Sequence, residues 1–296
     1  MLTFKKAELS DRHWVQKIYE ASGFRGCEYT FANLYLWSSE FGAIANYETF
    51  LTQRLQYQGR LQYIYPAGCC KPTGILALMR EDAHSHGQPL VIRSLTKETR
   101  AVLEDLYPAQ FTYREDRDAF DYLYEIDTLA ELKGRAYQST RNHINRFLEN
   151  FPGWYTEEIT PENLPVCQRL FDHWMTAHEA DGDGDRRAME RAFRHFEELR
   201  FEGLILYAEK DHPVAFSMGN PISRDTFDVN FEKAFADVQG AYPLINREFA
   251  RYVRAKYPQV RYLNREDDMG VAGLRTAKES YRPIFLEKYI ATEIIK

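Results

Sequence analysis

An order of predicted elements that occurs twice constrains the fold of this chain more than any other feature. Residues 61–126 read as strand, helix, strand, helix and strand, and the same order returns in residues 204–290. Pro89 and Pro258 stand at equivalent places, each just ahead of a short apolar strand. Residue identity between the stretches is poor, so the repetition is one of element order, and chance remains its alternative. We interpret it as an internal duplication.

Chain length supports two domains, because 296 residues exceed the size that one compact core usually serves. We expect domains at residues 1–132 and 133–296, with a helix over residues 133–151 as the connector. Tyr137 and Ile144 form part of its apolar stripe, and Arg141 lies inside that stripe. A buried guanidinium needs a partner, so Arg141 either bridges the two halves or binds a phosphate or carboxylate of a ligand.

Apolar spacing predicts a mixed α+β chain. We expect helices at residues 8–19, 29–37, from 74, 97–106, 243–256 and 274–278. We expect strands at residues 49–55, 61–65, 90–95, 111–113, 120–126, 204–209, 214–218, 226–231, 260–263 and 285–290, with a turn at Gln58 and Gly59.

Composition narrows the class of protein. Hydrophobic residues make up 44% and charged residues 28%, as in a globular protein, and a net charge of −6 argues against bulk nucleic-acid binding. The four cysteines form no CxxC pair, which indicates reduced thiols. The N-terminus lacks the apolar run of a signal peptide, and no stretch approaches the roughly 18 apolar residues of a membrane span. We therefore expect a cytoplasmic protein without a transmembrane segment.

Several common site motifs are absent or incomplete. The stretch from Asp181 to Asp185 resembles the start of a calcium loop, but Arg186 and Ala192 stand where an EF-hand needs Gly and Glu. We expect a loop there, with Asp185 capping a helix that begins near Arg186. No zinc spacing, Walker loop, Rossmann fingerprint or G-x-S-x-G elbow appears, so we expect no metal site.

Gly240 precedes a predicted helix whose free N–H groups are suited to an anion. Gln239, Gly240 and Ala241 are also a fragment of the Q/R-x-x-G-x-G/A loop of acyl-CoA enzymes. A single glycine makes this a weak signal for either kind of site.

The run from Tyr262 to Pro283 concentrates charge at a strand end and continues into a helix, which makes it the best site candidate. Gly273, Leu274, Arg275 and Lys278, followed by Tyr281 and Pro283, resemble the G-L-R-x-x-K pattern, with its aromatic residue and proline, in the transferase domain of phosphatidylglycerol lysyltransferases.

The segments 141–147 and 28–37 are similar to the soluble family grouped with that domain, DUF2156. The resemblance implies tandem duplicated GNAT-like acyltransferase domains, with mixed sheets flanked by helices. The flippase half of the lipid enzymes is missing, so the acceptor is open.

The resemblance also implies transfer of an aminoacyl group from aminoacyl-tRNA to an amine or hydroxyl acceptor, without a covalent enzyme intermediate and without a cofactor. Its chemistry needs a base for the acceptor, charge for the oxyanion and positioning of both substrates. Catalytic candidates are Lys278, Glu266, Asp267 and Tyr281. Binding candidates are Arg275, Arg141, Asn142, Asn230, Asn264 and Gly240.

Other interpretations stay open at this point. Arg275 and Lys278 pair instead with Glu266 and Asp267 in a purely structural interpretation. An acyl-CoA-dependent N-acyltransferase, with acetyl-CoA or another acyl-CoA as co-substrate, uses the same fold, and a non-catalytic binding module is the third alternative. The sequence does not name the small-molecule, peptide or lipid acceptor.

Overall fold

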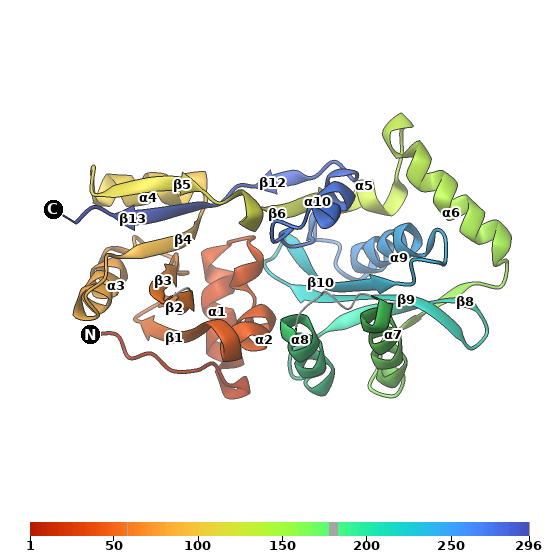
Figure 1. Cartoon of the computed structure of the whole chain (residues 1–296), viewed down its shortest axis with the longest axis horizontal. Coiled ribbons are helices and arrows are strands. Elements are labelled where there is room, and N and C mark those ends of the chain that lie inside the picture. Colours follow the sequence, from red (N-terminus) through yellow and green to blue (C-terminus); the bar gives the residue numbers. More distant parts are fainter. Residues whose placement is uncertain (58, 178–182, 296) are drawn as a thin grey trace. The chain divides into compact units, whose positions relative to one another are not determined.

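The computed structural model describes residues 1–57, 59–177 and 183–295, which form two compact units (Figure 1). Unit 1 holds Met1–Tyr122, Glu266–Lys278 and the chain from Ile284 onward, and unit 2 holds Leu123–Arg265 and Glu279–Pro283. The boundary expected after residue 132 thus falls elsewhere, and the C-terminal strand returns to unit 1. The reason is strand pairing, because this strand hydrogen-bonds between two strands of the first sheet.

Unit 1 contains a six-stranded sheet in the order β1-β2-β3-β4-β13-β5. Its strands are β1 (Gly42–Tyr47), β2 (Phe50–Tyr57), β3 (Arg60–Ile64), β4 (Val91–Leu95), β5 (Phe111–Glu115) and β13 (Tyr289–Glu293). Its helices are α1 (Arg12–Ser22), α2 (Phe31–Phe41), α3 (Thr73–Ser85) and α4 (Lys97–Leu106), and α10 (Ala272–Glu279) begins in this unit. Only β3 and β4 pair in parallel, so a crossover must join them, and α3 is that crossover.

The core of unit 1 lies between the sheet and its two amphipathic helices α3 and α4. Ile75 and Met79 of α3 and Leu103 of α4 pack against Tyr63 and Ile92 of the strands, and all five are fully buried. Each helix turns one face toward this core, so its apolar residues recur at helical spacing in the sequence. That spacing is why both helices could be predicted.

Unit 2 contains most of a seven-stranded sheet in the order β12-β6-β11-β10-β9-β8-β7. The strands of this sheet are β6 (Asp121–Glu125), β7 (Tyr155–Glu158), β8 (Glu202–Glu209), β9 (His212–Pro221), β10 (Thr226–Ala234), β11 (Tyr262–Asn264) and β12 (Ile284–Leu286). The helices are α5 (Ile126–Glu131), α6 (Gln138–Asn150), α7 (Leu164–Ala177), α8 (Asp183–Arg194) and α9 (Ala241–Lys256). Figure 1 shows α9 and α7 on opposite faces of β9 and β10.

The two units repeat one pattern of strand, helix and parallel strand. In unit 1 the pattern is β3, α3 and β4, and in unit 2 it is β10, α9 and β11. In both cases the two strands pair in parallel. This confirms the predicted α+β architecture of mixed sheets flanked by helices.

Some predicted details differ from the structure. The strand expected at residues 285–290 is split into β12 and β13, because the chain leaves extended pairing around Lys288, whose side chain enters a buried ion cluster. The helix expected to start near Arg186 starts at Asp183, so Asp185 lies in its first turn instead of capping it. Gln58 and residues 178–182 lie outside the described part of the chain.

Arg141 on α6 finds its partners locally. Its guanidinium donates hydrogen bonds to the carbonyl oxygens of Leu132 and Gly134 and to Gln138 Oε1, all within unit 2. These bonds hold the turn that leads into α6. Of the two expected roles of Arg141, the bridge between halves is therefore replaced by local bonds at the start of the connector, and the binding of a ligand phosphate or carboxylate stays a prediction. Among the described helices, none combines the length and apolar character needed to cross a bilayer.

Candidate functional site

The loop after β11 carries three consecutive acidic residues and an unusual backbone. Glu266 has φ 56° and Met269 has φ 50°, both in the left-handed region that non-glycine residues avoid, and Gly270 follows with φ 77°. The carbonyl of Glu266 accepts a hydrogen bond from Tyr122 N–H at 3.1 Å, which holds the loop in this conformation. Backbone strain of this kind costs of order 1–3 kcal/mol per residue and often marks functional sites.

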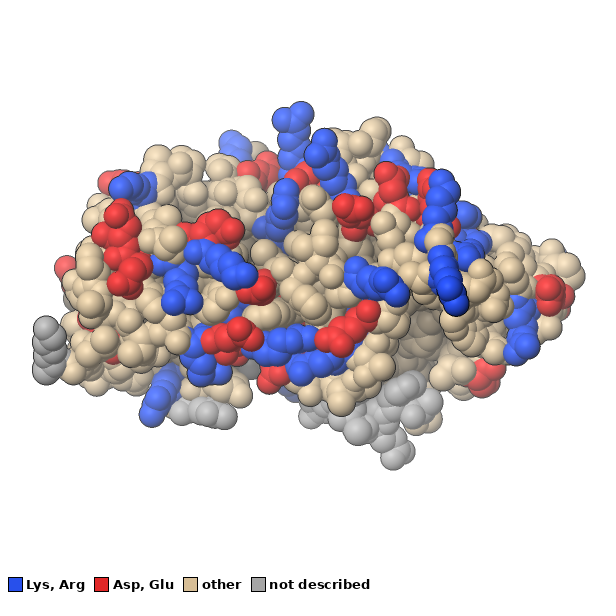
Figure 2. Space-filling view, turned by 90° about the horizontal axis from the view of Figure 1, so that it is seen from above, with Lys and Arg blue, Asp and Glu red and all other residues tan. Residues whose placement is uncertain are grey.

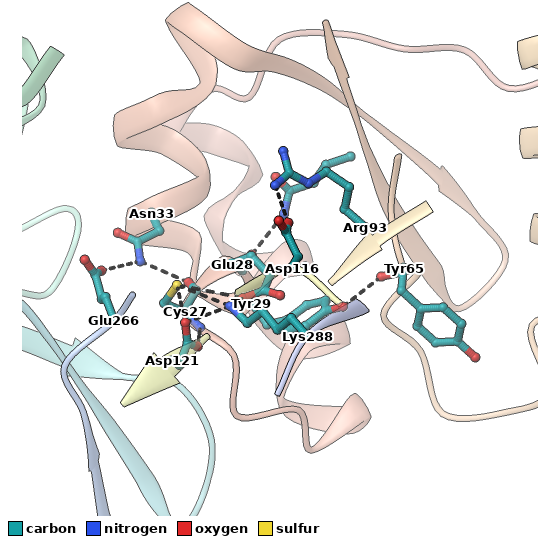
Figure 3. A network of polar contacts seen from close by, with 11 residues as sticks. Cys27, Glu28, Tyr29, Asn33, Tyr65, Arg93, Asp116, Asp121, Glu266 and Lys288 are labelled. Atoms are coloured by element: carbon teal, nitrogen blue, oxygen red, sulfur yellow. Dashed lines mark hydrogen bonds and ion pairs between the residues drawn. The ribbon is translucent and has the colours of Figure 1, made fainter. Parts of the chain in front are cut away.

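Glu266 is held in unit 1 against the N-terminal segment that contains Cys27 and Asn33. Asn33 Nδ2 donates to Glu266 Oε1 at 2.8 Å and to the Cys27 carbonyl at 3.0 Å (Figure 3). Burial is the largest cause that raises the pKa of Glu266 to about 8. The acids Asp267 and Asp121 add to this rise, and Asn33 and Lys278 oppose it. Glu266 therefore exchanges its proton near neutral pH.

Asp267 and Lys278 lie in the same electrostatic environment as Glu266. Burial raises the pKa of Asp267 to about 6, although Lys288 and Lys278 oppose the shift. Lys278 is 8% exposed, and its Nζ donates a hydrogen bond to the Asp267 carbonyl. The structure thus brings together the three residues that the charged run predicted as a site.

Arg275 has a different partner from the one expected. Its guanidinium forms a bidentate pair with Asp268, at 2.9 Å from Nε and 2.8 Å from Nη2, and Nη2 reaches Asp118 at 2.7 Å. Neither Glu266 nor Asp267 is the partner, which corrects the structural interpretation that paired Arg275 with them. Asp268 is fully buried, which alone would raise its pKa, but bonds from Arg275, Tyr122 and the Gly270 N–H hold the pKa of Asp268 well below its usual range. The pair anchors the start of α10 to the loop.

A second set of buried charges adjoins this loop and was missed by the sequence. Lys288 is 3% exposed, and its Nζ lies 2.7 Å from both Glu28 Oε2 and Asp121 Oδ1 (Figure 3). Burial alone would lower the pKa of Lys288, but the charges of Asp121, Cys27 and Glu28 raise it well above its usual range. The ammonium is therefore charged and fully compensated.

Cys27 completes this cluster as a thiol. Its N–H donates to Asp121 Oδ2 at 2.8 Å, and its Sγ lies 3.3 Å from Asp121 Oδ1 and 3.9 Å from Lys288 Nζ. Burial and the charge of Asp121 raise the pKa of the Cys27 thiol well above its usual range, so it is no nucleophile at neutral pH. Ligand atoms of Cys27, Glu28 and Asp121 lie within 4.8 Å of one another, but the Lys288 ammonium already bonds to both carboxylates.

Two sequence signals point to this cluster in retrospect. Lys288 interrupts an apolar stretch, and a lysine in such a stretch must find buried partners. Glu28 and Asn33 both belong to the segment 28–37, which served only to support the family resemblance. Asp121 gave no comparable signal.

The remaining catalytic candidate, Tyr281, lies in unit 2. Its ring is 6.5 Å from that of Tyr124, and the Arg265 guanidinium lies 5.4 Å from the ring centre of Tyr281. Burial raises the pKa of Tyr281 to about 12. Arg265 in turn pairs with Glu232 at 2.8 Å, beyond the last backbone pairing of β10 and β11, so this ion pair joins the two strands where they diverge.

The other binding candidates occupy two separate places in unit 2. Asn264 is fully buried opposite Leu123, and Asn230 donates to Asp228 Oδ2 at 3.1 Å. Asn142 is exposed on α6, where it accepts from Gln138 at 2.8 Å. Their roles in substrate binding stay predictions.

Gly240 has a structural reason to be glycine. Its φ is 90°, and a Cβ at this position would lie 2.3 Å from the His143 carbonyl oxygen of α6. Gln239 also contacts α6, because Arg146 lies 3.3 Å from its amide oxygen. The N-terminus of α9 is thus packed against α6, and its binding of an anion stays a prediction.

Comparison with known proteins gives the family. The model of the phosphatidylglycerol lysyltransferase C-terminal domain matches residues 19–292. A conserved protein of unknown function from Bacteroides thetaiotaomicron is 36% identical, with a TM-score of 0.93 over 99% of this chain and 100% of that one. An uncharacterised protein of Mycoplasmoides gallisepticum is 22% identical over 179 residues, which is 59% of this chain and 56% of that protein, so the match spans little more than half of this relative.

More distant solved structures share the fold. L-PGS from Bacillus licheniformis is 15% identical with a TM-score of 0.68, over 94% of this chain and 90% of that one. The C-terminal DUF2156 domain of a putative lysylphosphatidylglycerol synthetase from Agrobacterium fabrum is 14% identical with a TM-score of 0.70, over 97% and 92%. These likenesses show a shared fold, and the match over residues 19–292 shows that the chain belongs to the family of the phosphatidylglycerol lysyltransferase C-terminal domain.

Proposed function

We propose that this protein transfers an aminoacyl group from aminoacyl-tRNA to an amine or hydroxyl acceptor. Family membership supports the donor class. The observation that carries the proposal is the Glu266 carboxyl, whose pKa is about 8. This carboxyl stands on a strained loop, and Asp267 of the same loop and Lys278 of α10 belong to its electrostatic surroundings. A general base works best when its pKa lies near the working pH, and burial has moved this carboxyl to that range.

The chemistry needs only groups that this cluster contains. The acceptor nitrogen or oxygen attacks the ester carbonyl and gives its proton to the Glu266 carboxylate. The bond from the carbonyl carbon to the tRNA 3′ oxygen then breaks, and the proton passes from Glu266 to that oxygen, which leaves as a hydroxyl. We assign Lys278 to the negative charge that develops on the carbonyl oxygen, and Asp267 to the ammonium of the aminoacyl group. The ester is already activated, so no covalent enzyme intermediate is required. Tyr281 is proposed separately to orient a reacting oxygen.

Arg275 is better suited to positioning than to binding a phosphate. Its donors are directed at Asp268 and Asp118, and the Asp268 pair restrains the loop that carries Glu266 and Asp267. This engagement is also what a non-catalytic binding module would show, so that alternative remains the second candidate.

An acyl-CoA-dependent activity has less support. The loop at Gly240, the place of the fragmentary coenzyme A motif, is packed against the His143 carbonyl of α6. A pyrophosphate at this helix N-terminus would have to displace that contact.

We expect few ionic contacts with tRNA phosphates, because the described residues form no continuous positive patch on the face shown in Figure 2. The net charge is −6, and on the face shown in Figure 2 the Lys and Arg side chains are interspersed with Asp and Glu. We therefore expect a shallow dependence of tRNA affinity on salt, since each phosphate contact adds about 0.7 to 0.9 to the slope of log K against log salt.

The test is transfer from radiolabelled aminoacyl-tRNA, taken as a charged total pool and then as single species. Acceptors are phosphatidylglycerol vesicles, small primary amines and small alcohols, and acetyl-CoA replaces the tRNA in a parallel arm. We expect transfer from tRNA that rises with pH up to about 8 as Glu266 ionises.

Variants separate catalysis from folding. Glu266→Gln and Lys278→Ala should each lower the rate by at least about 100-fold, as is common for loss of a general base or an oxyanion donor. Lys71→Ala, at an exposed lysine, should leave the rate unchanged. Absence of transfer with every donor, or transfer from acetyl-CoA alone, would refute the proposal.

A further inference from the structure

One face of the sheet in unit 1 carries a hollow over the strands β3, β4, β13 and β5. Side chains alternate between the two faces of a strand. Tyr63, Ile92 and Ala291 point into the core with α3 and α4. Their neighbours along the chain fall on the opposite face, and these are Gln62 of β3, Val91 of β4, Ile290 of β13 and Arg114 of β5.

This opposite face contains a pocket of about 550 Å³. The volume lies within the roughly 300–1,000 Å³ range of pockets that bind small molecules. Val91 and Ile290 are 9% and 8% exposed and give it an aliphatic floor. Arg60, Arg114 and Thr292 also line it, so a guanidinium on β3 and another on β5 lie on either side of the apolar strands between them.

The charges around the pocket leave it positive. No acidic side chain is among its lining residues. The carboxylate closest to Arg114 belongs to Asp116 at 3.9 Å, and that carboxylate is bound at 2.5 Å by Arg93. The single negative charge of Asp116 is therefore shared by Arg93 and Arg114. An unbalanced guanidinium above an apolar floor attracts a carboxylate or phosphate.

The neutral polar groups add donors to this arrangement. Gln62 Oε1 accepts a hydrogen bond from Arg93 at 3.4 Å, so the Gln62 amide has its N–H donors left for a ligand. The Gln88 amide is used to hold the chain, because it accepts from the Leu61 N–H and donates to the Gly59 carbonyl. The pocket thus offers hydrogen-bond donors at its rim and aliphatic surface at its floor.

We propose that this pocket binds a small organic anion, a carboxylate or phosphate monoester with an apolar body of a few carbon atoms or one ring. The two arginines bind the anionic group, and Val91 and Ile290 pack against the body. Inorganic phosphate meets only the first requirement, and a cationic amine meets only the second. None of the lining residues belongs to the Glu266 cluster, so the proposal is independent of the proposed transfer reaction.

Ligand-detected NMR and calorimetry on the full chain test this site with four probes. The probes are phenyl phosphate, hexanoate, inorganic phosphate and benzylamine. We expect saturable binding of phenyl phosphate or hexanoate that weakens with added salt, at least tenfold weaker binding of inorganic phosphate, and no binding of benzylamine. The two organic anions distinguish a phosphate site from a carboxylate site.

Matched charge variants locate the binding. The double variant Arg60→Gln with Arg114→Gln should lower the affinity at least tenfold, because both guanidinium groups are lost. The double variant Lys210→Gln with Arg224→Gln removes the same charge from exposed positions outside the pocket and should leave the affinity unchanged. Both arginines of the pocket are exposed, so thermal melting should stay within a few degrees of the wild type. Binding of neither organic anion at millimolar concentration, or equal loss in the two double variants, would overturn the proposal.

Discussion

The raised pKa of Glu266 predicts that neutralising this residue stabilises the folded protein at high pH. The folded pKa is about 8 and the ordinary value is 4.5. Between these values the folded chain keeps a proton that the unfolded chain has lost, so the free energy of unfolding falls as pH rises through this window. Glu266→Gln cannot lose that proton and should escape the decline.

The magnitude follows from the size of the shift. A difference of 3.5 pKa units corresponds to an upper limit of about 5 kcal/mol. The side chain of Glu266 keeps some solvent contact, so we expect a gain of about 2 to 5 kcal/mol for Glu266→Gln relative to wild type between pH 5 and pH 9. At pH 5 both side chains are neutral, and the two proteins should differ by less than about 1 kcal/mol.

Urea unfolding followed by circular dichroism at pH 5 and pH 9 measures this difference. If the two units unfold in separate steps, the step that responds to Glu266→Gln is compared. Asp268→Asn is the control, because the pKa of Asp268 is held below its usual range and this variant should lose a similar amount of stability at both pH values. A wild-type curve that does not decline relative to Glu266→Gln at pH 9 would refute the electrostatic reasoning.

Two further changes probe the buried ions and the packing of unit 2. Lys288→Met leaves Asp121 without its ammonium partner and should destabilise the protein by about 3–5 kcal/mol in urea unfolding, whereas Lys97→Met at an exposed pair should cost less than about 1 kcal/mol. Similar costs for both would contradict the assigned burial. Gly240→Ala should destabilise by more than about 2 kcal/mol because a Cβ meets a carbonyl of α6, while Gly273→Ala on α10 has open space and should be neutral or stabilising in the same melts. Tolerance of alanine at Gly240 would show that α6 packs differently.

The helices and most strands followed from local pattern alone. The segments α3, α4 and α9 carry an apolar stripe at helical spacing, and each appears close to its predicted range. The duplication was visible for the same reason, since each parallel pair needs a crossover helix between its strands. The strand at residues 285–290 was predicted as continuous because periodicity does not reveal that Lys288 binds acids elsewhere in the chain.

Part of the candidate site was also predictable from local sequence, and part of it was not. Glu266, Asp267 and Lys278 were predicted because a dense run of charge at a strand end is visible in sequence. Asp121 and Lys288 were missed because they are 167 positions apart and no local pattern links them. Arg275 was assigned the wrong partner in the structural alternative, since spacing along a helix does not show that Asp118 lies beside it.

By itself, the sequence determined the α+β class, the repeated order of elements, the family resemblance and the charged run after β11, because all of these are encoded in neighbouring residues. Tertiary structure alone decided which residues share one buried environment, and with it the protonation of Glu266. A carboxyl has the same intrinsic pKa wherever it stands in a sequence, and only burial, helped by the charges of Asp267 and Asp121, moves the pKa of Glu266 to about 8.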